Sequence, residues 1–232
     1  MTTINGAVAL VTGGQRGLGK AFTRELLERG AAKVYVTSRK PIEESDPRIV
    51  PLPLEVSDPA SVADLVKAAG DVSIVFNNAG VTGGTSLTDA DESEVRAVFE
   101  INVFGALRVA RAFAPVVAGN GGGALVDMHS VLSWIAGFGA YGASKAALWS
   151  LTNSLRIELA PAGTQVLGVH LGYADTDMIK DLDVPKTAPT EVAVAVVDAL
   201  EKGESEVLVD DISRNFKTAL SGPVEGLSGR QA

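Results

Sequence analysis

The 232-residue chain contains no cysteine and only two histidines. The lack of cysteine excludes disulfides and thiolate catalysis and leaves the redox compartment open. His129 and His170 are too few for a histidine-based metal site, so we predict no metal. Only 20 basic residues stand against 28 acidic ones, a formal charge of −8. This balance argues against a nucleic acid or an anionic membrane as the main partner.

Long apolar runs are also missing, because none approaches the length that spans a bilayer. Residues 1–6 lead directly into a strand-like segment and lack the regions of a signal peptide. We therefore expect no membrane partner and a cytoplasmic protein. A composition of 46% hydrophobic and 21% charged residues is typical of an ordinary globular chain.

Short β-branched runs alternate with helix-length amphipathic segments along the chain. This alternation predicts an α/β fold with a doubly wound parallel sheet of about seven strands. We expect one domain over residues 1–220 and a flexible tail over 221–232. The expected strands cover 7–11, 33–37, 49–53, 72–76, 124–128, 165–170 and 206–209. The expected helices lie near 18–29, 59–69, 91–118, 141–160, 190–202 and 213–220.

The first expected strand runs into a glycine-rich loop, Thr12-Gly-Gly-Gln-Arg-Gly-Leu-Gly19, and a helical pattern follows at once. Glycines at positions 13, 17 and 19 permit a tight turn and let a pyrophosphate approach the backbone and the helix N-terminus. An ordinary strand-to-helix turn is the alternative. The strand before the loop, the helix after it and its place in the chain favour a dinucleotide site and a Rossmann fold.

The second expected strand ends in Ser38, Arg39 and Lys40, and Arg16 lies in the glycine-rich loop. A carboxylate at this strand end would bind the ribose hydroxyls and repel a 2′-phosphate. Small polar and cationic groups suit the phosphate instead, since arginine binds it with a planar fork. Unless these residues are only solvated charges, the pattern predicts NADP(H) rather than NAD(H).

Tyr141 and Lys145 lie four residues apart in an expected helix, so they share one helix face. A lysine held beside a tyrosine favours the phenolate, and we expect Lys145 to lower the Tyr141 pKa from about 10. Tyr141 would then donate or accept a proton near neutral pH. An exposed surface pair is the alternative interpretation.

Asn102 lies on the buried apolar stripe of the helix expected near 91–118. A buried polar group there needs a hydrogen-bond partner or a functional role. It is either a satisfied core amide or a residue that orders a water and a helix break beside Lys145. The segment Asn77-Asn-Ala-Gly80 ends another strand with small residues, which fits either a turn or the passage of a cofactor.

Ser130 follows the fifth expected strand, at the edge where open α/β sheets bind ligands. Its hydroxyl could donate to a carbonyl oxygen while Tyr141 supplies the proton. His129 precedes Ser130, so its side chain points to the opposite face of the strand. We therefore interpret His129, and likewise His170 at another strand end, as packing residues and expect no hydrolase triad.

Together, Thr12-Gly13, Gly17-Leu-Gly19, Asn77-Asn-Ala-Gly80, Asn102, Ser130, Tyr141 and Lys145 resemble the single-domain short-chain dehydrogenase/reductase family over roughly residues 6–210. The resemblance implies hydride transfer between the nicotinamide and a carbonyl or alcohol carbon. By it, the catalytic residues are Tyr141 as acid/base, Ser130 as carbonyl binder, Lys145 on the nicotinamide ribose, and Asn102 holding a relay water. The implied cofactor-binding residues are Gly13, Gln15, Arg16, Gly17, Leu18, Gly19, Ser38, Arg39, Glu55, Val56, Asn78, Ala79, Gly80, Tyr141, Lys145, Gly172, Ala174 and Thr176.

The chain departs from the family pattern at several positions. Glu55 stands where the third strand usually supplies an aspartate to the adenine, and Leu171 replaces a frequent proline. The spacing from Ser130 to Tyr141 is slightly short, which makes Ser133 a fallback for the carbonyl-binding serine. The region between Thr176 and the next helix is also short, so we expect a rather open substrate site.

These features predict an NADPH-dependent carbonyl reductase of small molecules, with the reverse alcohol oxidation available. A 3-oxoacyl thioester reductase is the nearest alternative and would need a basic docking patch, for which Arg108 and Arg111 are candidates. A non-catalytic NADP(H) sensor is the third hypothesis. Spare apolar residues on two helices, and the family's habit of pairing there, predict a homodimer or homotetramer. These residues include Leu107, Leu148, Trp149 and Leu151.

Overall fold

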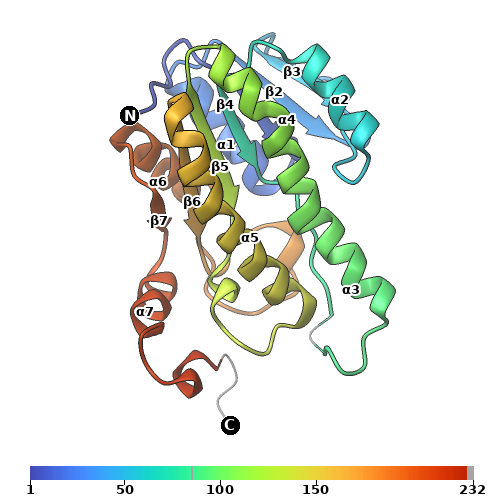
Figure 1. Ribbon diagram of the computed structural model, residues 1–232, viewed down its shortest axis with the longest axis vertical. Coiled ribbons are helices and arrows are strands. Elements are labelled where there is room, and N and C mark those ends of the chain that lie inside the picture. The colour runs from blue at the N-terminus through green and yellow to red at the C-terminus, as the bar shows by residue number, and fades with distance from the viewer. Residues whose placement is uncertain (85, 229–232) are drawn as a thin grey trace.

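The computed structural model describes residues 1–84 and 86–228, which form a parallel sheet between two layers of helices (Figure 1). The sheet has seven strands in the order β3-β2-β1-β4-β5-β6-β7, all paired in parallel. The strands are β1 Val8–Thr12, β2 Lys33–Ser38, β3 Ile49–Pro53, β4 Ile74–Asn77, β5 Gly123–Met128, β6 Thr164–His170 and β7 Glu206–Leu208. The α-helices are α1 Gly17–Glu28, α2 Pro59–Ala68, α3 Glu92–Phe99, α4 Ala106–Gly119, α5 Gly139–Leu159, α6 Pro189–Lys202 and α7 Asp211–Ala219. The predicted doubly wound sheet is confirmed.

Each face of the sheet packs against its own helices, because side chains alternate along a strand. In β1, Ala9 and Val11 join a cluster with Phe22 of α1 and residues of α6. Leu10, between them, joins the other cluster with Phe113 of α4 and residues of α2 and α5. The strands are apolar on both faces because both faces are covered.

The strand order reverses between β1 and β4, which opens a crevice at the carboxyl ends of these strands. Thr12 ties the two strand ends together there. Its hydroxyl donates to the Phe76 carbonyl (3.2 Å) and accepts the backbone N–H groups of Asn78 and Ala79 (2.9 Å each). The glycine-rich loop after β1 and the Asn77–Gly80 segment after β4 are thereby held side by side.

One continuous helical stretch, Glu92–Gly119, joins α3 and α4 through a π-helical segment, Glu100–Gly105. By length and composition its 28 residues could cross a membrane, contrary to the expectation that no apolar run is long enough. Part of this stretch is buried within the protein, since 44% of its most apolar 18-residue window is buried. Val109 and Phe113, for example, pack against the sheet. These properties also fit a helix of a protein core.

The chain continues past β7 into α7, which extends below the sheet in Figure 1. A short 3₁₀-helix, Val224–Leu227, follows α7, and the Ala136 N–H donates to the Leu227 carbonyl (2.8 Å). Part of the tail expected over 221–232 therefore has regular structure, and residues 229–232 lie outside the described residues. The domain boundary at 220 stays a prediction.

Candidate active site

The glycine-rich loop has the shape of a phosphate cradle. Gly13 and Gly17 adopt positive φ angles of 65° and 50°, where other residues are strained. A Cβ at Gly19 would overlap the carbonyl oxygen of Gly13, so only glycine lets the helix start so close to the loop. The first turn of α1 has no side-chain cap, so its N–H groups face the loop. These features fit a pyrophosphate at the N-terminus of α1.

The segment after β6 reaches over this loop. Gly172 donates its N–H to Asp210 Oδ2 (2.6 Å), and Thr187 pairs with the backbone of Tyr173 and Asp175. Anchored in this way, the segment brings Thr176 so close that a Cβ at Gly17 would lie 3.3 Å from Thr176 Cγ2. The structure thus brings the predicted Gly172–Thr176 stretch to the glycine-rich loop, and Ala174 is buried within it.

The carboxyl end of β2 borders the same crevice. Ser38 donates its hydroxyl to Gln15 Oε1 (3.0 Å), which also accepts the Ile42 N–H (3.0 Å). Arg16 and Arg39 are exposed, and their guanidinium groups make no hydrogen bond or ion pair with the residues that the structure describes. Two uncompensated cations beside a small hydroxyl fit an anionic group such as a 2′-phosphate.

The remaining predicted cofactor residues line the neighbouring strand ends or support them. The Glu55 carboxylate accepts the Ser57 hydroxyl (2.8 Å) and so shapes the turn after β3. Val56 is buried against Gly105, where a Cβ would come within 2.8 Å of it. Asn78 donates from Nδ2 to the Thr12 carbonyl (2.8 Å). Leu18 packs against the core beneath α1.

Three elements bring the four predicted catalytic side chains together. Tyr141 and Lys145 lie on α5, Ser130 follows β5, and Asn102 lies in the π-helical segment. The Ser130 hydroxyl lies near enough to the Tyr141 hydroxyl to lower its pKa. Lys145 Nζ lies 5.7 Å from the centre of the Tyr141 ring. A Cβ at Gly80 would lie 3.2 Å from Asn102 Oδ1 and 3.8 Å from Lys145 Nζ, so these two side chains meet at Gly80.

Asn102 is fully occupied by hydrogen bonds of its own. Its Oδ1 accepts the Val81 N–H (2.9 Å), and its Nδ2 donates to the Val81 carbonyl (2.9 Å) and to Ser144 Oγ (3.0 Å). The predicted helix break is present as the π-helical segment, a form that often marks functional sites. Both readings of Asn102 therefore hold in part, while the ordered water stays a prediction.

The ionisation of the Tyr141–Lys145 pair differs from the expectation. Burial raises the pKa of Tyr141 to about 12, although the nearby Ser130 hydroxyl lowers it. Burial lowers the pKa of Lys145 to about 8, although Asp127 opposes this. Lys145 donates to the Met128 carbonyl (2.6 Å), not to the tyrosine hydroxyl. The expectation that Lys145 lowers the Tyr141 pKa is therefore wrong for the protein alone.

Ser130 and Ser133 differ in their contacts. The Ser130 hydroxyl accepts the Leu132 N–H (3.1 Å) and lies near Tyr141, whose pKa it lowers. The Ser133 hydroxyl is buried and has no hydrogen-bond partner among the described residues. The geometry favours Ser130 as the partner of Tyr141.

A set of buried polar residues under the site was not predicted from the sequence. Asp127 is fully buried and accepts from Asn77 (2.9 Å) and Thr152 (2.7 Å). His129 and His170 are buried, as packing residues would be, but they also hydrogen-bond with each other (3.1 Å). The signal was present in the sequence, because Asp127 and His129 are polar residues two apart on one face of an otherwise apolar strand.

The chain is similar to several known proteins. It is 29% identical to the oxidoreductase UcpA of Escherichia coli K12 over 97% of this chain and 95% of that protein. It is 29% identical to the ketoacyl reductase HetN of a Nostoc species over 90% of this chain and 80% of that protein. A short chain dehydrogenase from Burkholderia cenocepacia, solved in complex with NADP, is 37% identical with a TM-score of 0.90, and 97% of each chain is covered.

The match to a family model agrees with these relatives and with the geometry. The model is described as short chain dehydrogenase, and it matches residues 7–186. The matched range contains the glycine-rich loop, the π-helical segment and the Ser130, Tyr141 and Lys145 side chains. Members of the family bind nicotinamide cofactors. The chain therefore belongs to the short-chain dehydrogenase family of oxidoreductases.

Proposed function

We propose that the protein is an NADPH-dependent reductase of ketones or aldehydes that can also run the reverse alcohol oxidation. The observation that carries this proposal is that Ser130, Tyr141 and Lys145 lie together near the carboxyl ends of β4 and β5. A hydroxyl pair next to a buried cation is suited to polarise a carbonyl oxygen and protonate it.

The pKa of Tyr141 favours the reductive direction. A tyrosine whose pKa burial raises to about 12 is protonated at neutral pH and serves as an acid. In reduction, Ser130 donates to the carbonyl oxygen and Tyr141 gives that oxygen its proton. NADPH, when bound, supplies the hydride to the carbonyl carbon. The Tyr141 phenolate left behind then regains a proton from solvent.

The choice of NADP(H) over NAD(H) rests on the end of β2. Arg16 and Arg39, both free of ion pairs with described residues, and the Ser38 hydroxyl face the region where an adenosine ribose would lie. The NADP complex of the Burkholderia relative supports this choice. We expect Arg39→Asp to shift the ratio of kcat/KM values towards NADH, with Arg24→Asp, an exposed change on α1, as control. An unchanged ratio would contradict the 2′-phosphate argument.

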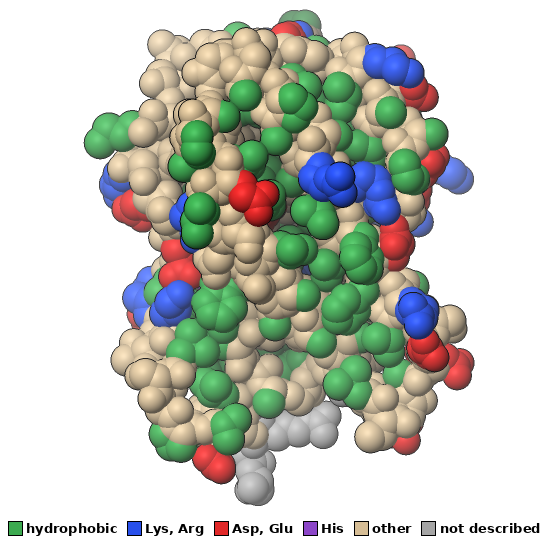
Figure 2. Space-filling view, in the orientation of Figure 1, with side chains coloured by type: hydrophobic (Ala, Val, Ile, Leu, Met, Phe, Trp, Pro, Cys, Tyr) green, Lys and Arg blue, Asp and Glu red, His purple; other side chains and the backbone are tan. Residues whose placement is uncertain are grey.

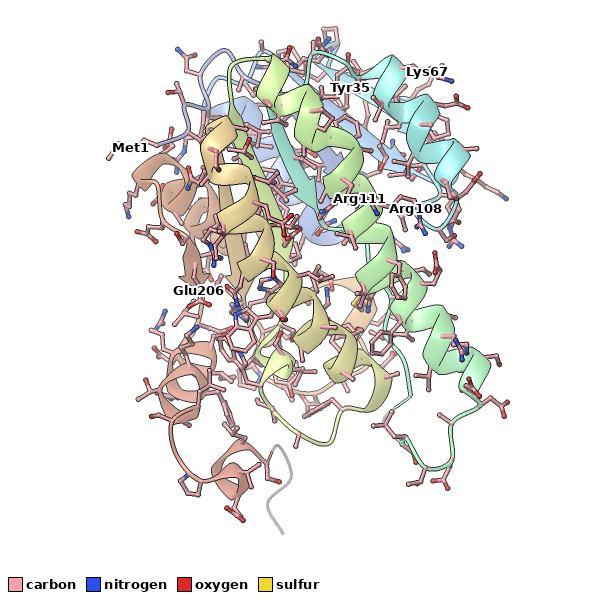
Figure 3. The ribbon with its side chains drawn as sticks, viewed as in Figure 1. Met1, Tyr35, Lys67, Arg108, Arg111 and Glu206 are labelled. Atoms are coloured by element: carbon pink, nitrogen blue, oxygen red, sulfur yellow. The ribbon has the colours of Figure 1, made fainter. Side chains whose placement is uncertain are left out.

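The similarity to a ketoacyl reductase supports the thioester alternative. One of the two arginines of its candidate docking patch, however, is bound within the chain. Arg108 is engaged in the chain, donating to Glu100 Oε1 (2.9 Å) and to the Val56 carbonyl (2.5 Å). Arg111 remains exposed on the same helix (Figure 3). One arginine with no partner among the described residues is a weak site for an acidic carrier protein, so we prefer a small carbonyl substrate.

NADPH consumption against a panel of ketones, aldehydes and 3-oxoacyl thioesters, followed by absorbance, tests the function. We expect Tyr141→Phe to lose roughly 10²–10⁴-fold in kcat, the usual contribution of a positioned acid. Tyr35→Phe is the matched control, because Tyr35 donates to Asp71 (3.0 Å) away from the site (Figure 3). Full activity in Tyr141→Phe would refute the mechanism. Tight NADPH binding without consumption of any carbonyl would favour the sensor.

We also propose a homodimer or homotetramer that pairs through the two expected helical segments, although other apolar residues on them are exposed. Leu148 is buried in its own chain and Trp149 packs edge-on against Trp134, so neither is spare. Phe104 and Ile157 are instead 51% and 78% exposed. Figure 2 shows hydrophobic side chains gathered over the part of this face where α3 and α5 lie. Sedimentation of Ile157→Lys against wild type tests this surface.

A further inference from the structure

A row of buried polar side chains leads from beneath the active site to the surface, and the proposed function gives it no role. Asp127 Oδ2 lies 2.7 Å from Thr152 Oγ1, which lies 2.8 Å from His129 Nε2. His129 Nδ1 lies 3.1 Å from His170 Nε2, which lies 3.5 Å from Glu206 Oε1. The Glu206 side chain is 26% exposed at the edge of the molecule (Figure 3). We call these five residues the histidine relay.

The two imidazole rings of the histidine relay are fixed by their surroundings. Trp134 stacks on the His170 ring with centroids 4.0 Å apart and planes 21° apart. The His129 ring lies over Gly168, where a Cβ would come within 2.7 Å of His129 Cε1. With the rings held, the hydrogen positions decide which contacts are made.

In neutral form, Thr152 and the two histidines carry three polar hydrogens between them. His170 Nδ1 lies 3.2 Å from the Ser130 carbonyl, an acceptor only, so His170 holds its hydrogen there. His129 must then donate from Nδ1 to His170, and Thr152 must donate to His129 Nε2. No hydrogen is left for the contact between Thr152 and Asp127, so Asp127 must itself be protonated to make it.

A second arrangement contains the same number of protons. Asp127 is now a carboxylate that accepts from Thr152, Thr152 accepts from His129 Nε2, and His129 Nδ1 accepts from His170. His170 still donates to the Ser130 carbonyl and is therefore a cation facing Glu206. Three short proton hops convert one arrangement into the other. The Leu148 carbonyl, 2.8 Å from Thr152 Oγ1, competes for the same hydroxyl hydrogen in both.

We propose that the histidine relay holds one proton and passes it between Asp127 and His170, so that Asp127 alternates between acid and carboxylate beside Lys145. The five residues touch neither substrate nor reacting atoms and are positioning residues. Their effect is on Lys145, whose ammonium is stabilised when Asp127 is ionised. A consequence of this effect on Lys145 for turnover rests on the proposed function, whereas the proton shift itself does not.

Some of the charges around the histidine relay favour the proton on Asp127, and others favour it on His170. Burial raises the pKa of Asp127, while Lys145 and Arg156 lower it. Burial lowers the pKa of His170, the nearby Glu206 raises it, and Lys217 lowers it again. Burial and the same cations keep the pKa of His129 well below its usual range, so His129 passes protons without holding a charge. Hydrogen bonds from Thr152 and Asn77 favour the Asp127 carboxylate, and the Lys145 ammonium is the nearby cation that adds to them.

The two arrangements are distinguished by NMR, because they put the His129 hydrogen on different nitrogens. The chain has only two histidines, so long-range ¹H–¹⁵N spectra of tag-free protein show two rings. We expect Nε2–H on His129 while Lys145 is charged and Nδ1–H once it is neutral, so the tautomer changes as the pH rises through the Lys145 pKa of about 8. Lys145→Met should keep Nδ1–H throughout.

Variants in the relay complete the test. Thr152→Val removes the hydroxyl link and should abolish the tautomer change, whereas Thr152→Ser should restore it. Glu206→Gln, at the surface, should move the change down by about one pH unit, and it carries the test if Thr152→Val does not fold. A His129 tautomer that is identical in wild type, Lys145→Met and Glu206→Gln from pH 6 to 9 would overturn the proposal. A wild type that reduces no carbonyl would refute only the proposed function.

Discussion

The buried ammonium of Lys145 destabilises the fold at neutral pH, and a methionine in its place should relieve this cost. Burial lowers the Lys145 pKa from 10.5 to about 8. The unfolded chain therefore binds this proton more tightly than the folded one. The penalty is fully present below pH 8 and is relieved as the pH rises towards 10.5. A difference of this size corresponds to about 3 kcal/mol at pH 7 and less than about 1 kcal/mol at pH 10.

Urea unfolding of wild type and Lys145→Met at both pH values measures this change. We expect the stability of the variant relative to wild type to fall by about 2 kcal/mol between pH 7 and pH 10. The absolute difference is smaller than the burial cost, because the variant loses the hydrogen bond to the Met128 carbonyl. Lys67→Met, at a side chain that is 76% exposed, is the control and should show no such change. A difference that is the same at both pH values would refute the depressed pKa.

Two further substitutions probe the supports of the site. Gly168→Ala places a Cβ 2.7 Å from His129 Cε1, so we expect a loss of roughly 1–3 kcal/mol in urea unfolding; an unaltered midpoint would show that the ring can move. Asn102→Leu removes both hydrogen bonds to Val81 and the one to Ser144, and should cost roughly 2 kcal/mol or more. Hydrogen exchange at the Val81 amide should accelerate in this variant. Unchanged protection would contradict the role of the Asn102 side chain in holding Val81.

The fold could be predicted because its signals are local in the sequence. Residues 74–76 of β4 are all apolar because helices cover both faces, and Gly13, Gly17 and Gly19 are required by the backbone of one short loop. Ser130 and the Asn77–Gly80 segment were predicted from strand ends, whereas Asn102, Tyr141 and Lys145 were predicted from helical spacing. Their roles and the choice of NADP(H) over NAD(H) still await the substitutions above.

The electrostatics of the site could not be read from spacing. The separation of Tyr141 and Lys145 by one helical turn gives their proximity, but not that the ammonium turns to the Met128 carbonyl. Nor does it show that burial dominates both pKa values. The histidine relay joins β5, α5, β6 and β7, and only the strand register and the side-chain rotamers bring its members into contact.

The π-helical segment Glu100–Gly105 holds about one residue more per turn than an α-helix does. Deleting a single residue from the segment would let ordinary α-helical winding close, with α3 and α4 kept nearly in phase. The widened turn that carries Asn102 would be lost, and with it the placement of Asn102 against Val81 and Ser144. Chain length at this point is therefore as tightly constrained as side-chain identity, and a one-residue indel here should be more damaging than most substitutions.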